Sequence, residues 1–390
     1  MDTIIVQPIQ ANQRTVIVDI LRGWALLGVV LGNYSDFFGF GKTFVHPPEL
    51  ISTVLEYFNF YFFAAKSWTL LSVLFGYGFA IVMNNVATKG NNPVLFFLKR
   101  MFWLFVIAFI NSSFWFGDIL KDYALLGLLL LFFHRCTAKT AFRLSIILIV
   151  IVPFLAAYLT YLNLYDVEKA FNSHVLPLFY SHNWLDVFLM NLKGTYYTEM
   201  LSPSYAIIAR MVMFACMLLG FSAQRINFFD RLAEFKKQLK TIFWLCLALA
   251  ILLNAGLLYA LSLKFQFTYF KPRYLIILST MLTIASGICL LYINGKLKGF
   301  FHNLQAMGKM TLTNYIVQNV IAAFLFLNIG LGIFNTMPFW FYIGIALVIY
   351  ILQLFFSKWW LTYYNYGPIE WIWRQLTYGK RLPIKKKVPS

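Results

Sequence analysis

The chain has 390 residues, of which 61% are hydrophobic and 12% are charged, and its formal net charge at pH 7 is +18. A soluble domain is roughly half apolar and about a quarter charged, so a soluble globule could not bury this much apolar surface. The positive charge does not indicate nucleic-acid binding, because the basic residues lie in short connections between apolar blocks rather than on one soluble face.

The apolar residues form blocks whose length suits a helical crossing of about 30 Å of hydrocarbon. Because the backbone in lipid must satisfy its own hydrogen bonds, each block is predicted to be a helix. The second block is too long for a simple crossing and carries Lys66 at its centre, so it predicts either a steeply tilted helix or a broken pair of half-helices. The sequence thus predicts an all-α, polytopic membrane bundle of about ten transmembrane helices, near 16–38, 53–83, 101–116, 119–134, 144–163, 203–222, 241–263, 274–294, 310–330 and 338–357.

The distribution of lysine and arginine predicts the orientation of these helices. Most of the 32 basic residues lie in alternate connections and in the C-terminal tail, and short cytoplasmic connections are expected to be basic. We therefore expect both ends of the chain in the cytoplasm and a location in the bacterial plasma (inner) membrane. A transmembrane bundle is predicted over residues 1–360, and an interfacial aromatic helix with a basic tail, held by anionic lipid, over residues 361–390.

Two further features have more than one interpretation. The longest outer connection, 164–202, contains His174 and His182 and could either cap an outward-facing cavity or be a plain solvated loop. The four cysteines show no C-x-x-C spacing and lie in or beside apolar blocks, so neither a metal site nor a disulfide framework is indicated.

Ionisable residues inside spans are costly and are therefore candidates for function. In the first span, Asp19 and Arg22 are three residues apart and can pair, and Asn33 lies three turns further along on about the same face. These residues could line a polar cavity, or the ion pair could only anchor the span at the interface. Small residues at the same level would allow close helix packing, namely Gly23, Gly28 and Gly32.

A second polar cluster lies between the third and fourth spans, in G-D-I-L-K-D-Y. Asp118, Lys121 and Asp122 have the spacing of a small network at a helix start, where carboxylates also favour the helix dipole. Asp118 could act in proton transfer, or it could only cap the fourth span, and the spacing favours the cap.

Further candidates are Lys66 and Arg210, which lie within spans and could hold an anionic ligand. Pairing of Lys66 with Glu56 or with a carbonyl oxygen is the structural alternative. Near the C-terminus, Asn314 and Tyr315 belong to a helix start rich in hydrogen-bonding groups. Glu370 and Arg374 are spaced as a pair on the interfacial helix.

The segments that carry these residues resemble the YeiB-like membrane protein family, known as domain of unknown function 418. The matching segments are V-D-I-L-R-G-W-A-L-L-G-V-V-L-G-N at 18–33, K-S-W-T-L-L-S-V-L-F-G-Y-G at 66–78, G-D-I-L-K-D-Y-A-L-L-G at 117–127, G-K-M-T-L-T-N-Y-I-V-Q at 308–318 and G-P-I-E-W-I-W-R-Q-L-T-Y-G at 367–379. That family is in turn similar to the transmembrane acyltransferases, which move an acyl group from a cytoplasmic thioester to a sugar-like acceptor outside.

This resemblance implies an acyl-CoA co-substrate and a glycan-like or small-molecule acceptor, with no bound cofactor. It also exposes a departure, because the family usually has a histidine a few residues before G-D-I-L, where this chain has Asn111. Asparagine cannot act as a base, so either another group substitutes or the chemistry is lost. Candidates for the substitute are Asp118 and the outer histidines His46, His174 and His182.

Two alternatives to the acyltransferase stay open from the sequence. The intramembrane charges could form the binding site of an organic-anion transporter, although the chain shows no internal repeat. A non-catalytic membrane scaffold is the third interpretation, and a solid bundle without a cavity between Asp118 and Arg22 would favour it.

Overall fold

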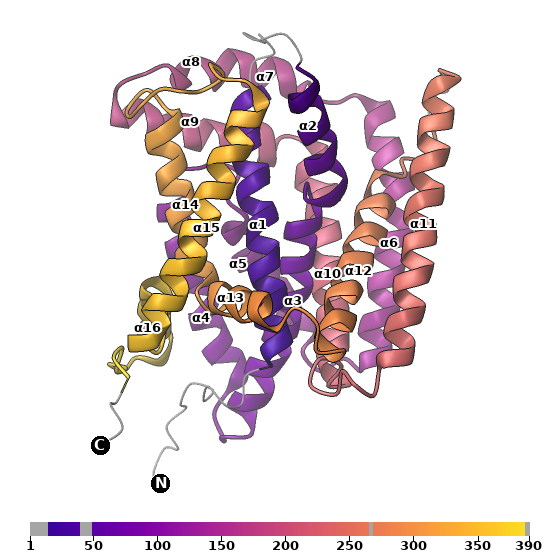
Figure 1. Cartoon of the computed structure of the whole chain (residues 1–390), viewed down its shortest axis with the longest axis vertical. Coiled ribbons are helices and arrows are strands. Elements are labelled where there is room, and N and C mark those ends of the chain that lie inside the picture. The colour runs from indigo at the N-terminus through magenta and orange to yellow at the C-terminus, as the bar shows by residue number, and fades with distance from the viewer. Residues whose placement is uncertain (1–14, 40–48, 265–267, 387–390) are drawn as a thin grey trace.

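The computed structural model describes residues 15–39, 49–264 and 268–386, and the regular structure in these ranges is helical apart from an isolated antiparallel bridge between Tyr364 and Lys385. Within these ranges, eight helical stretches are long and apolar enough to cross a membrane. Six are single helices: α1 (Val16–Gly39), α4 (Pro93–Asn111), α6 (Ala138–Leu162), α11 (Lys236–Ser262), α12 (Arg273–Ile293) and α15 (Phe339–Tyr363). Two are composite: α2 (Leu50–Phe62) with α3 (Lys66–Ala87), and the π-helix η4 (Ser204–Ala209) with α10 (Arg210–Arg225). The predicted class, an all-α membrane helix bundle, is confirmed (Figure 1).

Two shorter helices lie inside the same bundle. They are α5 (Ile119–Leu130), which continues into the turn η2 (Leu131–Phe133), and α14 (Thr311–Phe326). Helix α13 (Lys298–Lys309) precedes α14 and lies across the bundle instead of along it (Figure 1). Helix α14 therefore begins inside the bundle and not at its end. The described residues thus hold eight helical stretches of crossing length and two shorter helices, against about ten predicted crossings. The number of crossings and their orientation in a membrane stay predictions.

The long second block is a broken pair of helices, as one of the two interpretations predicted. Between α2 and α3 the chain turns at Ala65, which has a φ of 63° in the left-handed region. Lys66 opens α3, is buried, and donates a hydrogen bond from Nζ to the carbonyl oxygen of Phe60. The carbonyl alternative is therefore confirmed for Lys66. The break lets the lysine satisfy a backbone group that α2 leaves free at its C-terminal end.

The connections that carry most of the basic residues meet at one end of the bundle. Figure 1 shows the start of α1 and the helix α16 (Pro368–Tyr378) at this end, with the α3–α4, α10–α11 and α12–α13 connections. We call it the basic end. The opposite end is covered by the segment 164–202, which forms α7 (Val167–His174), α8 (Leu176–Phe179), α9 (Trp184–Gly194) and the π-helix η3 (Thr195–Met200).

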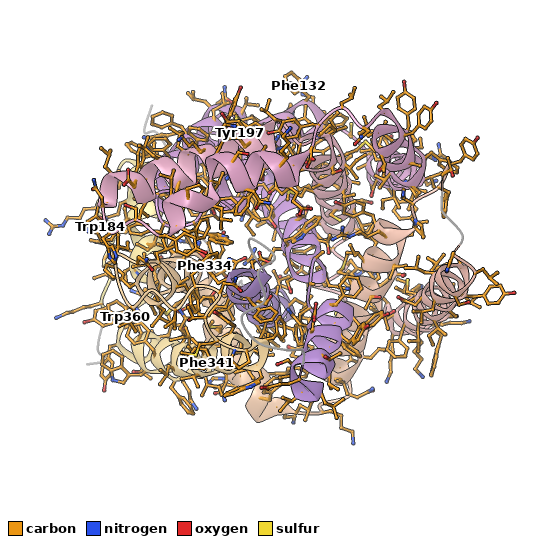
Figure 2. All side chains as sticks on the ribbon, turned by 90° about the horizontal axis from the view of Figure 1, so that it is seen from above. Phe132, Trp184, Tyr197, Phe334, Phe341 and Trp360 are labelled. Carbon is orange, nitrogen blue, oxygen red and sulfur yellow. The ribbon has the colours of Figure 1, made fainter. Side chains whose placement is uncertain are left out.

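The 164–202 segment is a helical cap and not a plain loop. Seen from its own end, the part that carries Trp184 and Tyr197 lies across the bundle (Figure 2). Phe171 and Phe179 on its inner side are buried. The segment is therefore folded over this end of the bundle, but the two cavities described below open at the basic end, so a cap over an outward-facing cavity stays a prediction.

Helices α1 and α13 cross at backbone contact. A Cβ atom on Gly23 would lie 2.2 Å from the carbonyl oxygen of Leu304, and one on Gly308 would lie 1.8 Å from the carbonyl oxygen of Asp19. Only glycine permits such an approach, so the predicted packing role is confirmed for Gly23. At Gly32 nothing lies within 4 Å of the same position, so packing does not require a glycine there. The crossing fixes Asp19 and Arg22 beside α13.

We expect Gly23→Ala to destabilise the protein much more than Gly32→Ala, although both residues lie on α1. The new methyl group at position 23 would overlap a backbone carbonyl that cannot rotate away, which costs about 1–3 kcal/mol or more. At position 32, alanine has open space and a better helix propensity, so the change should be neutral or stabilising by up to about 1 kcal/mol. Thermal unfolding of the two purified variants in the same detergent measures the difference. Equal melting temperatures would show that the crossing is looser than described.

Candidate functional site

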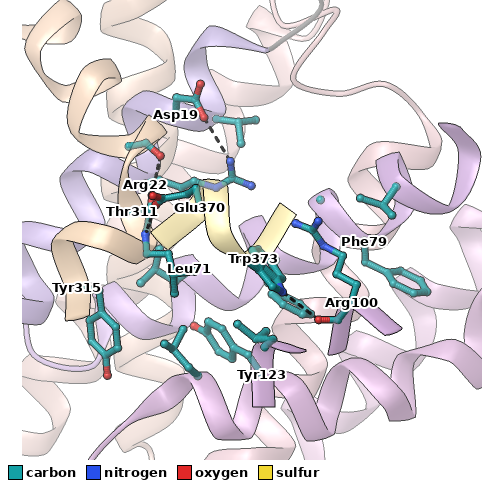
Figure 3. A pocket seen from close by; sticks show the side chains of 18 of the residues that line it. Asp19, Arg22, Leu71, Phe79, Arg100, Tyr123, Thr311, Tyr315, Glu370 and Trp373 are labelled. Carbon is teal, nitrogen blue, oxygen red and sulfur yellow. Dashed lines mark hydrogen bonds and ion pairs between the residues drawn. The ribbon is translucent and has the colours of Figure 1, made fainter. Parts of the chain in front are cut away.

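A cavity of about 290 Å³ opens between α1, α3, α4, α5, α13, α14 and α16. Its residues come from segments far apart in the chain, from Thr15 to Arg374, so it exists only in the folded bundle. Arg22 of α1 and Tyr315 of α14 both line it (Figure 3). Because the hydroxyl group of Tyr315 contacts Asp118, the cavity links the first polar cluster of the sequence to the second. The protein therefore does not form the solid bundle that would favour a scaffold.

Four cationic side chains line the cavity: Arg22, Arg100, Lys309 and Arg374. Figure 3 shows Arg22 and Arg100 extending toward the same space from two walls, near the ring of Trp373. The guanidinium carbon of Arg100 lies 3.7 Å from the centre of that ring, so cation–π stacking holds the group in place. Arg22 and Arg374 both repel Arg100 electrostatically. Such a concentration of like charge away from bulk water favours binding of an anion.

The two acids in the lining compensate this charge only in part. Asp19 Oδ1 lies 3.3 Å from Arg22 Nη1, which confirms the predicted ion pair. The Glu370 carboxylate is bound to the start of α14. It accepts hydrogen bonds from the backbone N–H groups of Leu312 and Thr313 and from the Thr313 hydroxyl group. Burial raises the pKa of the Glu370 carboxyl group, and the hydrogen bonds from Thr313 oppose that shift.

Glu370 therefore joins α16 to the first turn of α14, where free N–H groups and the helix dipole favour a carboxylate. The pairing of Glu370 with Arg374 along α16, which their spacing suggests, stays a prediction. In the structure, Arg374 reaches the cavity, and its guanidinium carbon lies 4.8 Å from the ring centre of Tyr366. Helix α16 is thus more than an interfacial anchor, because it supplies Trp373 and Arg374 to the wall of the cavity.

Much of the rest of the cavity wall is apolar. Leu26, Leu71, Phe75, Phe79 and Leu104 are among the side chains that line it. An inorganic anion would leave this surface uncovered by apolar contacts. The cavity therefore suits a ligand that has both negative charge and an apolar or weakly polar extension.

Beside the cavity, Tyr315 and Asp118 form a buried polar pair. The Tyr315 hydroxyl group donates to Asp118 Oδ1 at 2.9 Å and accepts from the backbone N–H of Ile119 at 3.3 Å. Asp118 also accepts from the Leu120 N–H at 3.0 Å, so the predicted capping role at the start of α5 is confirmed. Asp118 is fully buried and does not line the cavity, so Tyr315 stands between the carboxylate and any ligand.

Buried amide groups lie beside this pair. Asn111, at the position of the family histidine, is 1% exposed and lies against the Asp118 carboxyl group, although neither of its amide atoms makes a hydrogen bond of normal geometry among the described residues. Asn33 Nδ2 donates to Asn319 Oδ1 at 3.3 Å, while Asn319 Nδ2 also makes no such hydrogen bond there. Buried polar groups without partners are costly, and they commonly mark a place for water or a ligand.

The second cluster is split between two roles. Asp118 caps α5, whereas Lys121 and Asp122 pair with residues much later in the chain. Lys121 Nζ lies 2.6 Å from Glu199 Oε2. Arg210 Nε donates to Asp122 Oδ1 at 2.8 Å, and the Tyr205 hydroxyl group donates to Asp122 Oδ2 at 2.8 Å. The predicted local network of three residues is therefore wrong for Lys121 and Asp122. Glu199 belongs to η3, Tyr205 to η4 and Arg210 to α10, so this cluster joins these three elements to α5.

Several residues singled out from the sequence do not line the cavity. Lys66 is held by Phe60 and Arg210 by Asp122. Asn314 Nδ2 donates to Ser357 Oγ at 2.9 Å in the contact between α14 and α15. Of the intramembrane cations expected to contact an anion, only Arg22 lies in the cavity wall.

The histidines also lie outside the cavity wall where they can be placed. His174 stacks on Tyr197 with ring centres 4.3 Å apart, and a ring nitrogen of His182 lies 2.8 Å from the carbonyl oxygen of Asn328. His46 falls outside the described residues. Sequence reasoning missed the cavity role of Arg100 and Lys309, which were interpreted only as signals of orientation, and of Arg374, which was interpreted as a partner of Glu370.

These features define a multi-pass helical membrane protein with a cationic cavity at its basic end. Residues 223–380 match the model of a family described as "Protein of unknown function (DUF418)". The chain is similar over nearly its whole length to three bacterial proteins of that kind. It is 26% identical to the uncharacterized protein YxaH of Bacillus subtilis (strain 168), over 98% of both chains. It is 28% identical to an uncharacterized 39.9 kDa protein in the amylase 3' region of Bacillus acidopullulyticus, over 97% of this chain and 98% of the other.

The third relative is the uncharacterized protein YeiB of Escherichia coli (strain K12), which is 24% identical over 94% of this chain and 96% of its own. The chain is therefore similar to the YeiB-like proteins, and its C-terminal part matches the DUF418 model. The resemblance inferred from the sequence motifs is thus confirmed. The family match covers Lys309, Tyr315, Glu370 and Arg374 of the cavity, and the alignments with the relatives extend over the parts that contribute the rest.

Proposed function

We propose that this protein is a membrane acyltransferase that takes an acyl group from an acyl-CoA and transfers it to an envelope glycan or small-molecule acceptor. The cationic cavity carries the proposal. An acyl-CoA combines several phosphate charges with a long, less polar arm that ends in a thioester. Arg22, Arg100 and Arg374 match the phosphates, and the apolar wall up to Tyr315 matches the arm.

The location of the cavity agrees with this choice of donor. The basic end is the expected cytoplasmic side, because short cytoplasmic connections are enriched in lysine and arginine. Acyl-CoA is a cytoplasmic metabolite, so the donor would enter from the side where the cavity lies. We accordingly propose a location in the bacterial plasma membrane with both chain ends in the cytoplasm.

The buried polar pair supplies a route for the proton. In the transfer step, an acceptor oxygen attacks the thioester carbonyl carbon, a C–O bond forms and the C–S bond breaks. The acceptor proton passes through the Tyr315 hydroxyl group to Asp118 and returns by the same route to the departing thiolate, so the reaction balances without another reactant. Asn111 is buried outside the cavity lining and cannot act as a base, so no step of the transfer is assigned to it.

Purified protein with radiolabelled acetyl-CoA and an envelope extract tests the proposal. We expect label to move to an extract component, and we expect Asp118→Asn and Tyr315→Phe each to reduce the rate by about 100-fold or more, the range for loss of acid–base catalysis. Tyr158→Phe is the matched control, because Tyr158 is 58% exposed on α6 and far from the pair in the chain. Folded protein that transfers no label from any acyl-CoA tested would overturn the proposal.

The same cavity supports transport of an organic anion as a second candidate function. The observation in its favour is that four cationic side chains line the cavity, namely Arg22, Arg100, Lys309 and Arg374. Uptake of unmodified substrate into proteoliposomes, driven by a proton or sodium gradient, would support the transporter. An acyltransferase should release only modified acceptor and free CoA in the same experiment.

A further inference from the structure

A second cavity, of about 800 Å³, lies at the basic end on the other side of α1. It is bounded by the start of α1, the α10–α11 connection, the end of α12 and the first half of α13. Thr15 lines both cavities, and its hydroxyl group donates to Asp230, which separates them. This second cavity is not needed for the proposed acyl transfer.

Its lining has two chemically different parts. One wall is apolar and is formed by Val16, Ile17, Ile20, Phe229, Leu232, Ile293 and Phe301. The other part is a polar rim with Lys296 and Lys298, which are both exposed, and with Tyr292 and His302. A ligand that fits both parts has a negatively charged end and an apolar end.

The acid in this lining is already occupied. Asp230 accepts hydrogen bonds at Oδ1 from Thr15 and at Oδ2 from the Tyr77 hydroxyl group at 2.8 Å. It is therefore turned toward α1 and α3, and its charge is engaged away from the lysine rim. The rim keeps a net positive charge, which favours an anion over a zwitterion.

The rim lies in the turn between α12 and α13, at the basic end of the bundle. Gly295 and Leu297 have φ values of 65° and 55°, so the turn between α12 and α13 reverses sharply and presents Lys296 and Lys298 together. Lys236 at the start of α11 holds the turn through a 2.8 Å hydrogen bond to Asn294 Oδ1. On the same segment Leu297 is 56% exposed and Phe300 is 50% exposed. Exposed apolar side chains beside lysines are typical of an interfacial segment in contact with lipid.

We propose that the second cavity binds an anionic glycerophospholipid, with its phosphate at Lys296 and Lys298 and its upper chains against the apolar wall. Basic pockets between transmembrane helices on the cytoplasmic side commonly hold such head groups. A free phosphate or a nucleotide would satisfy the lysines but would leave the wall of α1, α12 and α13 without an apolar partner. The lipid satisfies both parts of the lining.

Lipid exchange into the purified full-length protein tests this site. The protein is placed in nanodiscs that contain phosphatidylglycerol and phosphatidylcholine, and retained lipid is measured by native mass spectrometry after release into detergent. We expect bound phosphatidylglycerol in the natural protein and about a ten-fold or greater loss in the double variant Lys296→Glu with Lys298→Glu, because each lysine near an anionic surface contributes about 1 kcal/mol. The matched control is Lys237→Glu with Lys240→Glu, which makes the same charge change on exposed residues of α11 outside the lining.

Three further results decide the outcome. Inorganic phosphate and glycerol phosphate should fail to displace the lipid, and efficient displacement by either would assign the site to a soluble phosphate compound and overturn the proposal. Equal retention in the rim variant and in the control would also overturn it. If the double variant does not fold, the single Lys298→Gln variant is measured instead, and it should show a smaller but selective loss of phosphatidylglycerol over phosphatidylcholine. Because acyl transfer is not measured, failure here leaves the proposed function standing.

Discussion

Replacing Arg100 with glutamine should weaken acyl-CoA binding by about 100-fold, because loss of one desolvated, hydrogen-bonded charge contact commonly costs about 2–5 kcal/mol. Arg100 extends into the cavity and is held by Trp373, so it is positioned before the ligand arrives. The affinity of the variant for acyl-CoA should fall mainly because the ligand dissociates faster. Equilibrium binding of labelled acetyl-CoA to the purified variant, at fixed salt, measures the effect.

The same variant should fold at least as well as the natural protein. Arg22 and Arg374 both repel Arg100, so removal of its charge relieves repulsion in the unliganded cavity. Arg135→Gln serves as the control, because Arg135 is exposed near the basic end and is not part of the cavity lining. Unchanged acetyl-CoA affinity in Arg100→Gln would mean that the donor, if any, binds elsewhere. A large loss of stability would show that Arg100 is structural.

Lys121→Met should produce the largest loss of stability of any single change considered. The Lys121 side chain is 11% exposed and the Glu199 side chain 4%, and the two form a 2.6 Å ion pair deep in the bundle. Removal of one partner leaves a buried charge, which costs about 3–5 kcal/mol. The expected result is a strongly lowered melting temperature or a low yield of folded protein in detergent.

The double variant Lys121→Met with Glu199→Met should recover most of that stability. Two apolar side chains of similar volume replace the pair without leaving a charge behind, and such replacements are often neutral or stabilising. Recovery in a double-mutant cycle is the diagnostic measurement. If Glu199→Met alone is as stable as the natural protein and the double variant is no better than Lys121→Met, then the lysine is held by Phe116 and Thr195 and not by the glutamate.

Local features of the bundle were predictable from the sequence for a physical reason. Apolar blocks must match the bilayer thickness, so their existence follows from length and composition. The break before Lys66, the Asp19–Arg22 pair and the Asp118 cap each depend on residues only a few positions apart. Such short-range geometry is set by the helix itself and needs no knowledge of the partners.

The cavity was only partly predictable. Arg22 and Tyr315 were identified as candidates because a polar group inside a span requires a partner. Arg100 and Arg374 lie at the basic end, where lysine and arginine are expected in any case. Their residue type therefore gave no sign of a binding role. Lys66 and Arg210 had a stronger signal, yet their side chains are occupied by Phe60 and Asp122.

The sequence by itself determined that lipid surrounds most of this chain, that its regular structure is helical, and that it is related to the YeiB-like proteins. Only the tertiary structure decided which charges face the cavity and which are paired. The reason is that the rotation of each helix about its axis depends on contacts with distant segments, such as Gly23 against Leu304 and Trp373 against Arg100. A hydrocarbon solvent constrains length and backbone hydrogen bonding but leaves that rotation to packing.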